Sequence, residues 1–543
     1  MPRWSLRSRH RAPFPWPELA GQVSGGSGAR IVVLTRGDES AVVDDLRSVA
    51  PSAEVTVHQL PLPEGELRRR LVAGGPYDLL VDLGGPRGVR RRFPEVVWHV
   101  RRGGAAVVRL ADDDPERVTK ARQFFEGLRD GGAGKAPGLK PRHHRALRDA
   151  VDDLELSGDW VRATLTTDAL PKISEDDATA LLAAAPRIGA TLGTVPGVTW
   201  QLGSEVTTSR PLPRNDLPVQ YVAPPAALRE YHDAVVMPGR ASWVDAGVLP
   251  ESFRFQGRAQ LRNRELHELA PGFVARPPEP AERLPGVWFH LSSPLPRHFG
   301  HTLTEQLSHA WGWAEARERH PSIRALVATK DGRRLASWEL EILAAAGIPS
   351  DLVTEVTEPV RVERLVDTTA MYEIGGFVHP AMRGLYDGVG AALAARATTT
   401  DRPARLFHTR RSAKRRCRNQ AEVEELFADA GFAIVAPEDS PLADQVARVR
   451  AADVVAGFAG SAMFHIALAA HPQHVIVITH EGYPAHNEYQ LAALLGHRLD
   501  LAVCVPDVPR TKAGYQRSAF HSDFTVDPET EGAYLRSVLA SLP

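Results

Sequence analysis

At 543 residues the chain is too long for one hydrophobic core, and we expect it to divide into two to four domains. A net charge of −1 argues against a protein built for nonspecific attraction to nucleic acid, whereas 43% hydrophobic residues suffice for ordinary globular packing. Cys417 and Cys504, the two cysteines, make neither a disulfide framework nor a zinc cluster. The sequence shows no secretory-signal pattern and no run of roughly 20 apolar residues, so we expect a cytoplasmic protein without a transmembrane segment.

The N-terminal region predicts a tail and then a small alternating domain. Residues 1–28 end in GQVSGGSGA and read as a flexible tail. Within 29–115, helical stretches alternate with strand-like segments, namely RIVVLT, EVTVHQL, YDLLVDLGG and AAVVRL. This alternation predicts a parallel sheet in a Rossmann-like domain.

Residues 77–110 resemble the later half of a methyltransferase-type Rossmann domain. The first strand, however, is followed by TRGDES and not by the glycine-rich turn that a cofactor would need. We therefore expect 29–115 to be a degenerate methyltransferase-like domain without a cofactor. An AdoMet-dependent enzyme centred on 29–112 is the alternative, and AdoMet binding by that fragment would establish it.

Residues 116–216 predict a linker or irregular region, with DGGAGKAPGLKPRHH as an exposed segment. Two α/β units then follow, at 217–400 and 401–543, separated by a Pro- and Thr-rich break near 398–403. Their expected strands include VWFHL, IRALVAT and LVTEV in the first unit, and ARLFHTR, AIVAP, DVVAGFAG and HVIVITH in the second. Two Rossmann-like lobes would face each other across a cleft, with a ligand at the carboxyl ends of the strands.

A basic loop in the second lobe predicts a phosphate site. HTRRSAKRRCRNQ (408–420) has six Arg or Lys residues between 410 and 418, directly after a predicted strand. A solvated basic loop is the simpler interpretation, but arginine forks match phosphate oxygens, and Arg410 is the first candidate. Asn419 has a structural alternative, because Asn419 and Glu422 form a capping-box-like start of the next helix and Gly431 its stop.

A glycine turn in the same lobe predicts a second anion contact. In DVVAGFAGSAMFHIALAA (453–470) a buried strand ends at Gly457, Gly460 follows, and a helix begins near Ser461. Free backbone N–H groups at a helix start attract anions, and glycine allows close approach. Any strand-to-helix turn can require glycine, so the prediction depends on the arginine loop lying in the same lobe. Together they predict a diphosphate site that needs no metal.

The helix predicted over 298–316 has a polar stripe. Steps of 100° place His298, Thr302, Glu305 and His309 close together, with His301 at the edge. Phe299, Leu303, Leu307, Ala310 and Ala314 fall on the opposite side and should pack on the sheet. Three interpretations stay open: a polar helix surface, a zinc site for which no further ligand cluster is evident, and an acid–base surface at the cleft.

Four motifs in order give a family resemblance over about 217–510. The segment His298-Phe-Gly-His301-Thr-Leu-Thr-Glu305 is similar to the N-x-x-H-x-x-x-E helix of glycosyltransferase family 61, with His in place of Asn. The other three matches are Thr409-Arg410 with Arg416-Cys-Arg-Asn419-Gln420, Gly431-Phe432…Pro437-Glu438…Gln445, and Gly457-Phe-Ala-Gly460-Ser-Ala-Met-Phe-His465. In the last of these, Ala459 replaces the family's His and His465 its Asn.

The resemblance implies a GT-B fold and inverting transfer of a hexosyl or pentosyl group from a nucleotide-sugar to a hydroxyl acceptor, with no cofactor and no required metal. Members of this family act in bacterial polysaccharide and capsule biosynthesis and on plant xylan and animal proteins, so the acceptor would be a glycan, a lipid-linked precursor or a protein. It implies catalytic or acceptor-contacting roles for His301, Glu305 and His298. Donor binding would fall to Arg410, Arg416, Asn419, Gln445, Gly457, Gly460, Ser461 and His465. The alternative function is a catalytically silent protein that binds nucleotide-sugars or assists polysaccharide assembly.

Overall fold

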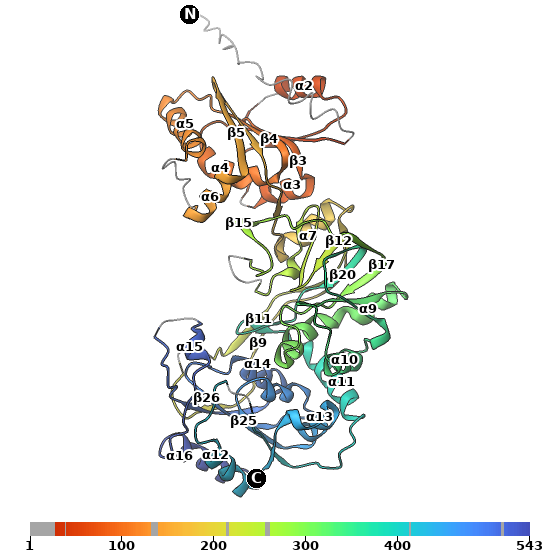
Figure 1. Ribbon diagram of the computed structural model, residues 1–543, viewed down its shortest axis with the longest axis vertical. Coiled ribbons are helices and arrows are strands. Elements are labelled where there is room, and N and C mark those ends of the chain that lie inside the picture. Colours follow the sequence, from red (N-terminus) through yellow and green to blue (C-terminus); the bar gives the residue numbers. More distant parts are fainter. Residues whose placement is uncertain are drawn as a thin grey trace, which may run out of the picture. The chain divides into compact units, whose positions relative to one another are not determined.

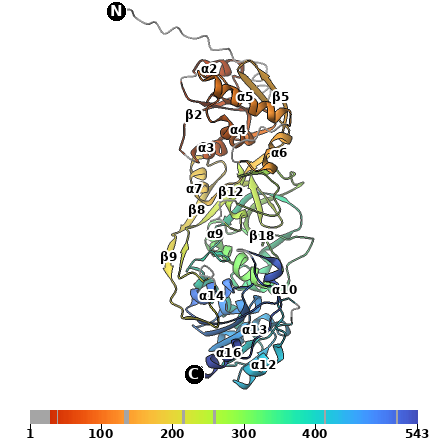
Figure 2. The same cartoon turned by 90° about the vertical axis from the view of Figure 1, so that its left-hand side faces the viewer.

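The computed structural model describes residues 28–37, 40–63, 65–131, 139–212, 217–255, 261–411, 414–511 and 515–543. Apart from Gly28, the tail predicted over 1–28 lies outside these residues. The chain forms two compact units: unit 1 comprises residues 1–190, 232–235 and 241–281, and unit 2 comprises 191–231, 236–240 and 282–543. Both are mixed α/β structures, which confirms the predicted α/β class at that level (Figures 1 and 2).

Unit 1 is built around a six-stranded sheet in the order β2-β1-β3-β4-β6-β5. The first four strands are parallel and β6 and β5 are antiparallel. Its elements are β1 (Arg30–Thr35), α2 (Ser40–Val49), β2 (Glu54–Gln59), α3 (Glu66–Gly74), β3 (Tyr77–Asp82), α4 (Val89–Val96), η1 (Val97–His99), β4 (Val100–Arg109), α5 (Pro115–Arg129), α6 (Pro141–Ala150), β5 (Val151–Ser157), β6 (Trp160–Leu165), β7 (Ala169–Pro171), α7 (Glu175–Ala184), β13 (Ala241–Val244), β14 (Gly247–Val248), η2 (Pro250–Ser252), β15 (Glu268–Ala270) and β16 (Phe273–Ala275).

Alternate residues of the unit 1 strands enter two different cores. Val32 and Leu34 pack on one side with residues of α3, α4 and α5, whereas Ile31 and Val33 pack on the other with residues of α2. A strand buried on both faces is continuously apolar, and β3 is buried at all six positions. This burial is the reason why RIVVLT and YDLLVDLGG could be recognised from sequence.

The predicted linker over 116–216 differs from the structure, which has regular elements on both sides of the undescribed residues 132–138. Helix α5 starts at an N-cap, Asp114, whose side chain accepts hydrogen bonds from the N–H groups of Glu116 and Arg117. Strand β5 lies at the edge of the sheet with one of its seven residues buried, so its sequence VDDLELS is charged and lacks the apolar run of a central strand. Exposure at the sheet edge thus concealed β5.

Unit 2 contains two sheets with parallel strands. In the first, β20, β17, β18 and β19 lie side by side and parallel. The elements of this part are β9 (Val198–Gln201), β11 (Gln220–Ala223), β17 (Glu282–His290), α8 (Phe299–His301), η3 (Thr302–Gln306), η4 (Leu307–Gly312), α9 (Trp313–Arg319), β18 (Arg324–Ala328), α10 (Ser337–Ala345), η5 (Ser350–Leu352), β19 (Val353–Val356), β20 (Val360–Thr368), β21 (Tyr372–Glu373), β22 (Phe377–Val378) and α11 (Met382–Ala394). Strands β8 (Gly189–Val195) and β12 (Ala226–Met237) carry residues of both units.

The second sheet of unit 2 has six parallel strands in the order β10-β27-β26-β25-β23-β24. Helices cover both faces: α13 and α14 pack on one and α12 and α16 on the other (Figure 1). The elements are β10 (Val206–Thr208), β23 (Arg405–His408), α12 (Gln420–Asp429), β24 (Ala433–Val435), η6 (Pro437–Asp439), α13 (Leu442–Ala451), β25 (Val454–Phe458), η7 (Ser461–Leu468), β26 (His474–His480), α14 (His486–Leu495), β27 (Arg498–Cys504), α15 (Arg517–Phe520) and α16 (Glu531–Ala540). None of the described helices is long and apolar enough to cross a membrane.

The segment predicted as one amphipathic helix over 298–316 is helical but irregular. It runs from the short α8 through a π-helical turn, η3, and a 3-10 stretch, η4, into α9. Every residue from 302 to 310 is buried, including Thr302 and His309 of the predicted polar stripe, whereas Ala314 of the predicted apolar side is exposed. The constant 100° step was wrong here because π and 3-10 turns change the angle per residue.

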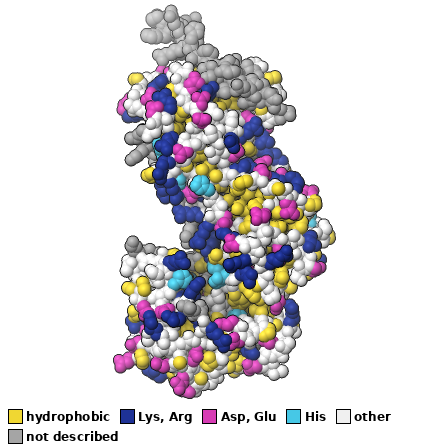
Figure 3. Space-filling view, viewed as in Figure 1, with side chains coloured by type: hydrophobic (Ala, Val, Ile, Leu, Met, Phe, Trp, Pro, Cys, Tyr) yellow, Lys and Arg dark blue, Asp and Glu magenta, His cyan; other side chains and the backbone are white. Residues whose placement is uncertain are grey.

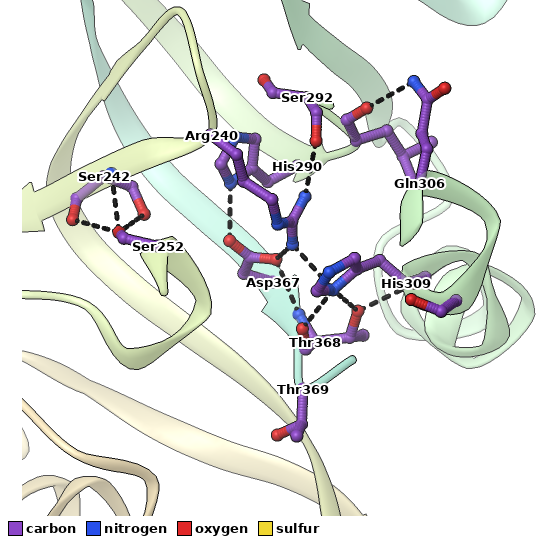
Figure 4. Close-up of polar contacts among 12 residues, drawn as sticks. Arg240, Ser242, Ser252, His290, Ser292, Gln306, His309, Asp367, Thr368 and Thr369 are labelled. Atoms are coloured by element: carbon purple, nitrogen blue, oxygen red, sulfur yellow. Dashed lines mark hydrogen bonds and ion pairs between the residues drawn. The ribbon is translucent and has the colours of Figure 1, made fainter. Parts of the chain in front are cut away.

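His309 lies in a buried polar cluster and does not face solvent (Figure 4). Asp367, in β20, accepts hydrogen bonds from Arg240 Nη2 at 2.7 Å and from His290 Nδ1 at 2.6 Å. His309 Nδ1 lies 2.7 Å from the Thr368 carbonyl oxygen and 2.8 Å from Arg240 Nη2. Burial opposes ionisation of Asp367, but Arg240 and His290 outweigh it and lower the pKa of this carboxyl group. These hydrogen bonds thereby connect η4 with strands β17 and β20.

Candidate active site

A histidine–glutamate pair lies at the start of the irregular helical segment. His301 Nδ1 and Glu305 Oε2 are 2.6 Å apart, and the side chains are 19% and 7% exposed. The His298 ring lies 4.4 Å from the His301 ring, centroid to centroid. Burial, followed by the charge of His301, lowers the pKa of His298 to about 4, so His298 is neutral near pH 7. The three predicted residues are therefore together, although their chemical roles stay predictions.

The glycine turn lies directly against this helical start. A Cβ added to Gly300 would be 2.7 Å from Phe464 Cε2 and 3.0 Å from Ser461 Oγ. The Phe299 ring stacks on the His465 ring at 4.4 Å. Residues 298–301 and 460–465, which are about 160 positions apart in sequence, thus form one contact surface within unit 2.

The close contact at Gly300 predicts how a substitution there changes the stability of the protein. Gly300→Ala should destabilise the protein by about 1–3 kcal/mol, because the new methyl group would overpack the contact with Phe464 and Ser461. Gly388→Ala is the matched control, since Gly388 lies in α11 with nothing within 4 Å of the added Cβ, and it should stabilise by roughly 0.5–1 kcal/mol. Denaturant unfolding measures both, and equal stability of the two variants would refute the close packing.

Two arginines of the basic loop reach the glycine turn. Arg410 Nη2 donates to the carbonyl of Ala459, and a Cβ added to Gly460 would be 2.7 Å from that nitrogen. The same added Cβ would be 3.0 Å from Arg415 Nη2. Burial, followed by the charge of Arg415, lowers the pKa of Arg410 to about 10, which leaves it protonated near pH 7. The structure thus joins the predicted arginine loop to the predicted glycine turn.

Arg415, not Arg416, is the second arginine at the turn. The guanidinium of Arg415 lies 4.2 Å from the centroid of the Tyr483 ring and 5.2 Å from that of Phe520. Arg416 instead pairs with Asp523, with its Nη2 3.0 Å from Asp523 Oδ2. The aspartate fixes Arg416 away from the turn, whereas two aromatic rings hold Arg415 beside it. Space-filling Figure 3 shows histidines and Lys or Arg side chains close together near α15.

The remaining predicted donor-binding residues make contacts of other kinds. Asn419 Nδ2 donates to the Val526 carbonyl at 2.9 Å, and its side chain does not cap α12 as the capping-box interpretation expected. Gln445 Nε2 donates to the Ser440 carbonyl, and nothing among the described contacts links it to the turn. A Cβ added to Gly457 would be 2.6 Å from the His408 carbonyl oxygen, so this glycine allows strand packing.

His465 and Glu488 complete the polar groups beside the turn. Burial lowers the pKa of His465 to about 4, and its Nδ1 lies 2.8 Å from the Ala462 carbonyl. Glu488, in the first turn of α14, accepts a hydrogen bond from the Gly460 N–H at 2.6 Å. Arg415, Tyr483 and Glu488 were not predicted as site residues from the sequence. Arg415 could have been chosen, because it belongs to the basic run. Glu488 could not, because no sequence pattern connects a residue of α14 with Gly460, 28 positions earlier.

The zinc interpretation receives no support from these contacts. Within the described residues no group of three or more His, Cys, Asp or Glu side chains is arranged to hold a metal ion. Glu305 pairs with His301, and His309 is occupied in the Arg240–Asp367 cluster. The available chemistry is a histidine–glutamate pair suited to proton transfer and an arginine pair suited to an anion.

The chain is similar to several solved methyltransferase structures at a low level. It is 14% identical to the MycE methyltransferase of the mycinamycin biosynthetic pathway, with a TM-score of 0.22, and the match covers 28% of this chain and 48% of that one. It is 14% identical to a protein-(glutamine-N5) methyltransferase from Alicyclobacillus acidocaldarius, with a TM-score of 0.19 and coverage of 28% and 93%. Likeness at this level does not establish a shared fold.

No curated protein matches the chain in sequence. Residues 299–477, in contrast, match the family model described as Glycosyltransferase 61. This segment begins at the contact between Phe299 and His465 and includes the His301–Glu305 pair, the arginine loop and the glycine turn. The resemblance seen in the sequence motifs is thus confirmed over this segment, and residues 299–477 are similar to glycosyltransferase 61.

Proposed function

We propose that the protein transfers a sugar from a nucleotide-sugar donor to a hydroxyl acceptor, with inversion of the anomeric configuration and without a required metal. The observation that supports this most is the packing of Gly300 on Ser461 and Phe464. Because of this packing, the His301–Glu305 pair, for which we propose proton transfer, and the arginine-lined turn lie on adjacent elements of one unit. Two sets of parallel strands in that unit, β20-β17-β18-β19 and the six-stranded sheet, are compatible with a GT-B fold, which remains part of the proposal.

The donor diphosphate would lie beside Gly460, between Arg410 and Arg415. Breaking the bond from the anomeric carbon to phosphate oxygen leaves the electron pair on the nucleoside diphosphate. Two fixed positive charges stabilise this developing negative charge, and neither has to reorganise during the reaction. We thus assign to Arg415 the diphosphate-binding role that the sequence predicted for Arg416.

The acceptor hydroxyl would lie beside His301 and Glu305. Its oxygen forms the new bond to the anomeric carbon from the face opposite the diphosphate, and its proton passes to the His301–Glu305 pair. Attack from the opposite face inverts the configuration, and the transition state would have oxocarbenium character. Glu305 orients the imidazole ring through the 2.6 Å contact with Nδ1, which directs Nε2 toward the acceptor.

A panel of nucleotide-sugars tests this proposal. Incubation with and without sugar acceptors should reveal one donor that is consumed, and NMR of the product should show the inverted anomer. Protein treated with EDTA should retain full activity, whereas a loss restored by zinc would contradict metal independence. Donor binding without hydrolysis or transfer across the panel would favour the catalytically silent alternative.

A further inference from the structure

Glu488 places a carboxylate inside the anion site at the glycine turn. Its side chain is fully buried at the first turn of α14. Oε1 accepts the Gly460 N–H at 2.6 Å, whereas Oε2 is buried without a hydrogen-bond partner among the described residues. A backbone N–H that could bind phosphate is therefore already bound to an acidic side chain.

Burial and the neighbouring arginines have opposite effects on the proton affinity of Glu488. Arg410 and Arg415 approach Gly460 from the basic loop, and among the described residues the phenols of Tyr483 and Tyr372 also interact electrostatically with this carboxyl group. Burial raises the pKa of Glu488 to about 7, because its own backbone N–H, the Gly460 N–H and the two arginines only partly offset the desolvation of the charged form. The carboxyl group is thus poised to gain or lose a proton near neutral pH.

We propose that Glu488 is a positioning residue that takes up one proton when a diphosphate binds beside Gly460. This inference rests on the donor site of the proposed function. The proton comes from solvent and binds to Oε2, while Oε1 keeps its hydrogen bond from Gly460. Protonation removes the repulsion between carboxylate and phosphate, and it converts Oε2 from an acceptor without a partner into an O–H donor for a phosphate oxygen.

The direction of the pH dependence follows from linkage. A bound anion raises the proton affinity of Glu488, so binding and protonation favour each other. Below about pH 7 the group is already protonated in the free protein, and diphosphate affinity should be highest and constant. Above this pH, affinity should fall by up to tenfold per unit as long as the bound form remains protonated. Between pH 6.5 and 8.5 the loss attributable to Glu488 should approach about 30-fold.

Calorimetry of the full chain with inorganic pyrophosphate tests this inference without any transfer reaction. Titrations at pH 7.5 in two buffers of different ionisation enthalpy measure the protons taken up on binding. The wild type should take up about 0.5 to 0.8 more proton per pyrophosphate than Glu488→Gln, and the comparison cancels the ionisation of pyrophosphate itself. Glu488→Gln keeps the shape and the acceptor for Gly460, and at pH 8.5 it should bind pyrophosphate about 30-fold more tightly than the wild type.

Glu425→Gln is the matched control, since Glu425 is exposed on α12, and it should behave as the wild type. Equal proton uptake by wild type and Glu488→Gln would overturn the inference, as would the absence of pyrophosphate binding. If Glu488→Gln does not fold, the wild-type titrations in the two buffers still test the proposal. A proton uptake that the ionisation of pyrophosphate accounts for completely would contradict it. Proton uptake without sugar transfer in the donor panel would instead refute only the proposed function.

Discussion

Replacing Arg410 by alanine is expected to abolish measurable donor binding. The side chain brings a positive charge to the Gly460 turn and also donates to the Ala459 carbonyl, so its loss removes a phosphate contact and loosens the turn. Truncating one member of a desolvated charge pair costs about 2–5 kcal/mol, which corresponds to a loss of affinity of about 30-fold or more. Calorimetry with the nucleotide-sugar selected from the panel measures the effect.

Arg411→Ala provides the matched control for this substitution. Arg411 is the next residue of the same loop, but its exposed side chain pairs with Asp439, with Nη1 to Oδ1 at 2.7 Å. Exposed pairs contribute about 0–1 kcal/mol, so this variant should keep nearly full donor affinity. Arg410→Lys should fall between the two, since lysine keeps the charge but loses the planar fork. Donor affinity of a folded Arg410→Ala protein within threefold of the wild type would exclude Arg410 from the site.

Substitution of the His301–Glu305 pair is expected to lower turnover and leave donor affinity unchanged. Removing a general base costs about 10²–10⁴-fold in rate, and His301→Ala and Glu305→Gln should each fall in this range. Because the two side chains share a hydrogen bond of 2.6 Å, we expect the double variant to be no slower than the slower single variant. Turnover at saturating donor and calorimetry of donor binding separate the two effects.

His471→Ala is a suitable control, because His471 is an exposed residue that pairs with Asp453 away from the helical start. It should retain wild-type turnover. Independent, multiplicative losses in the double variant would show that His301 and Glu305 do not act as a unit. Wild-type turnover in both single variants would remove the pair from the mechanism altogether.

Several central strands could be predicted from sequence because burial leaves an apolar run in them. Strands β1, β3, β23, β25 and β26 are central in their sheets, and their segments were recognised with nearly correct ends. Strand β5, in contrast, lies at a sheet edge and has one buried residue, Leu154. Sequence patterns report burial, so β5 was not recognised within 116–216.

In the candidate site, too, some features could be predicted from the sequence and others could not. The residue types of the helical start, the basic loop and the glycine turn could be recognised in sequence, as could their order along the chain. Their contact through Gly300 and Ser461 could not, because contacts between distant segments depend on how two sheets pack and leave no local periodicity. The same reason explains why the predicted polar stripe placed His309 at the surface, although Arg240 and Asp367 hold it in the interior.

The sequence by itself therefore determined which side chains are available for the site, and the tertiary packing decided which of them come into contact. Six basic residues compete in one loop, and the choice of Arg415 over Arg416 depends on Tyr483 and Asp523, both more than 60 positions away in sequence. Glu488 carries no motif of its own, yet burial against the Gly460 N–H gives it a proton affinity unlike that of an exposed glutamate. Desolvation and partner charges act through space, which is why they become visible only when the chain is folded.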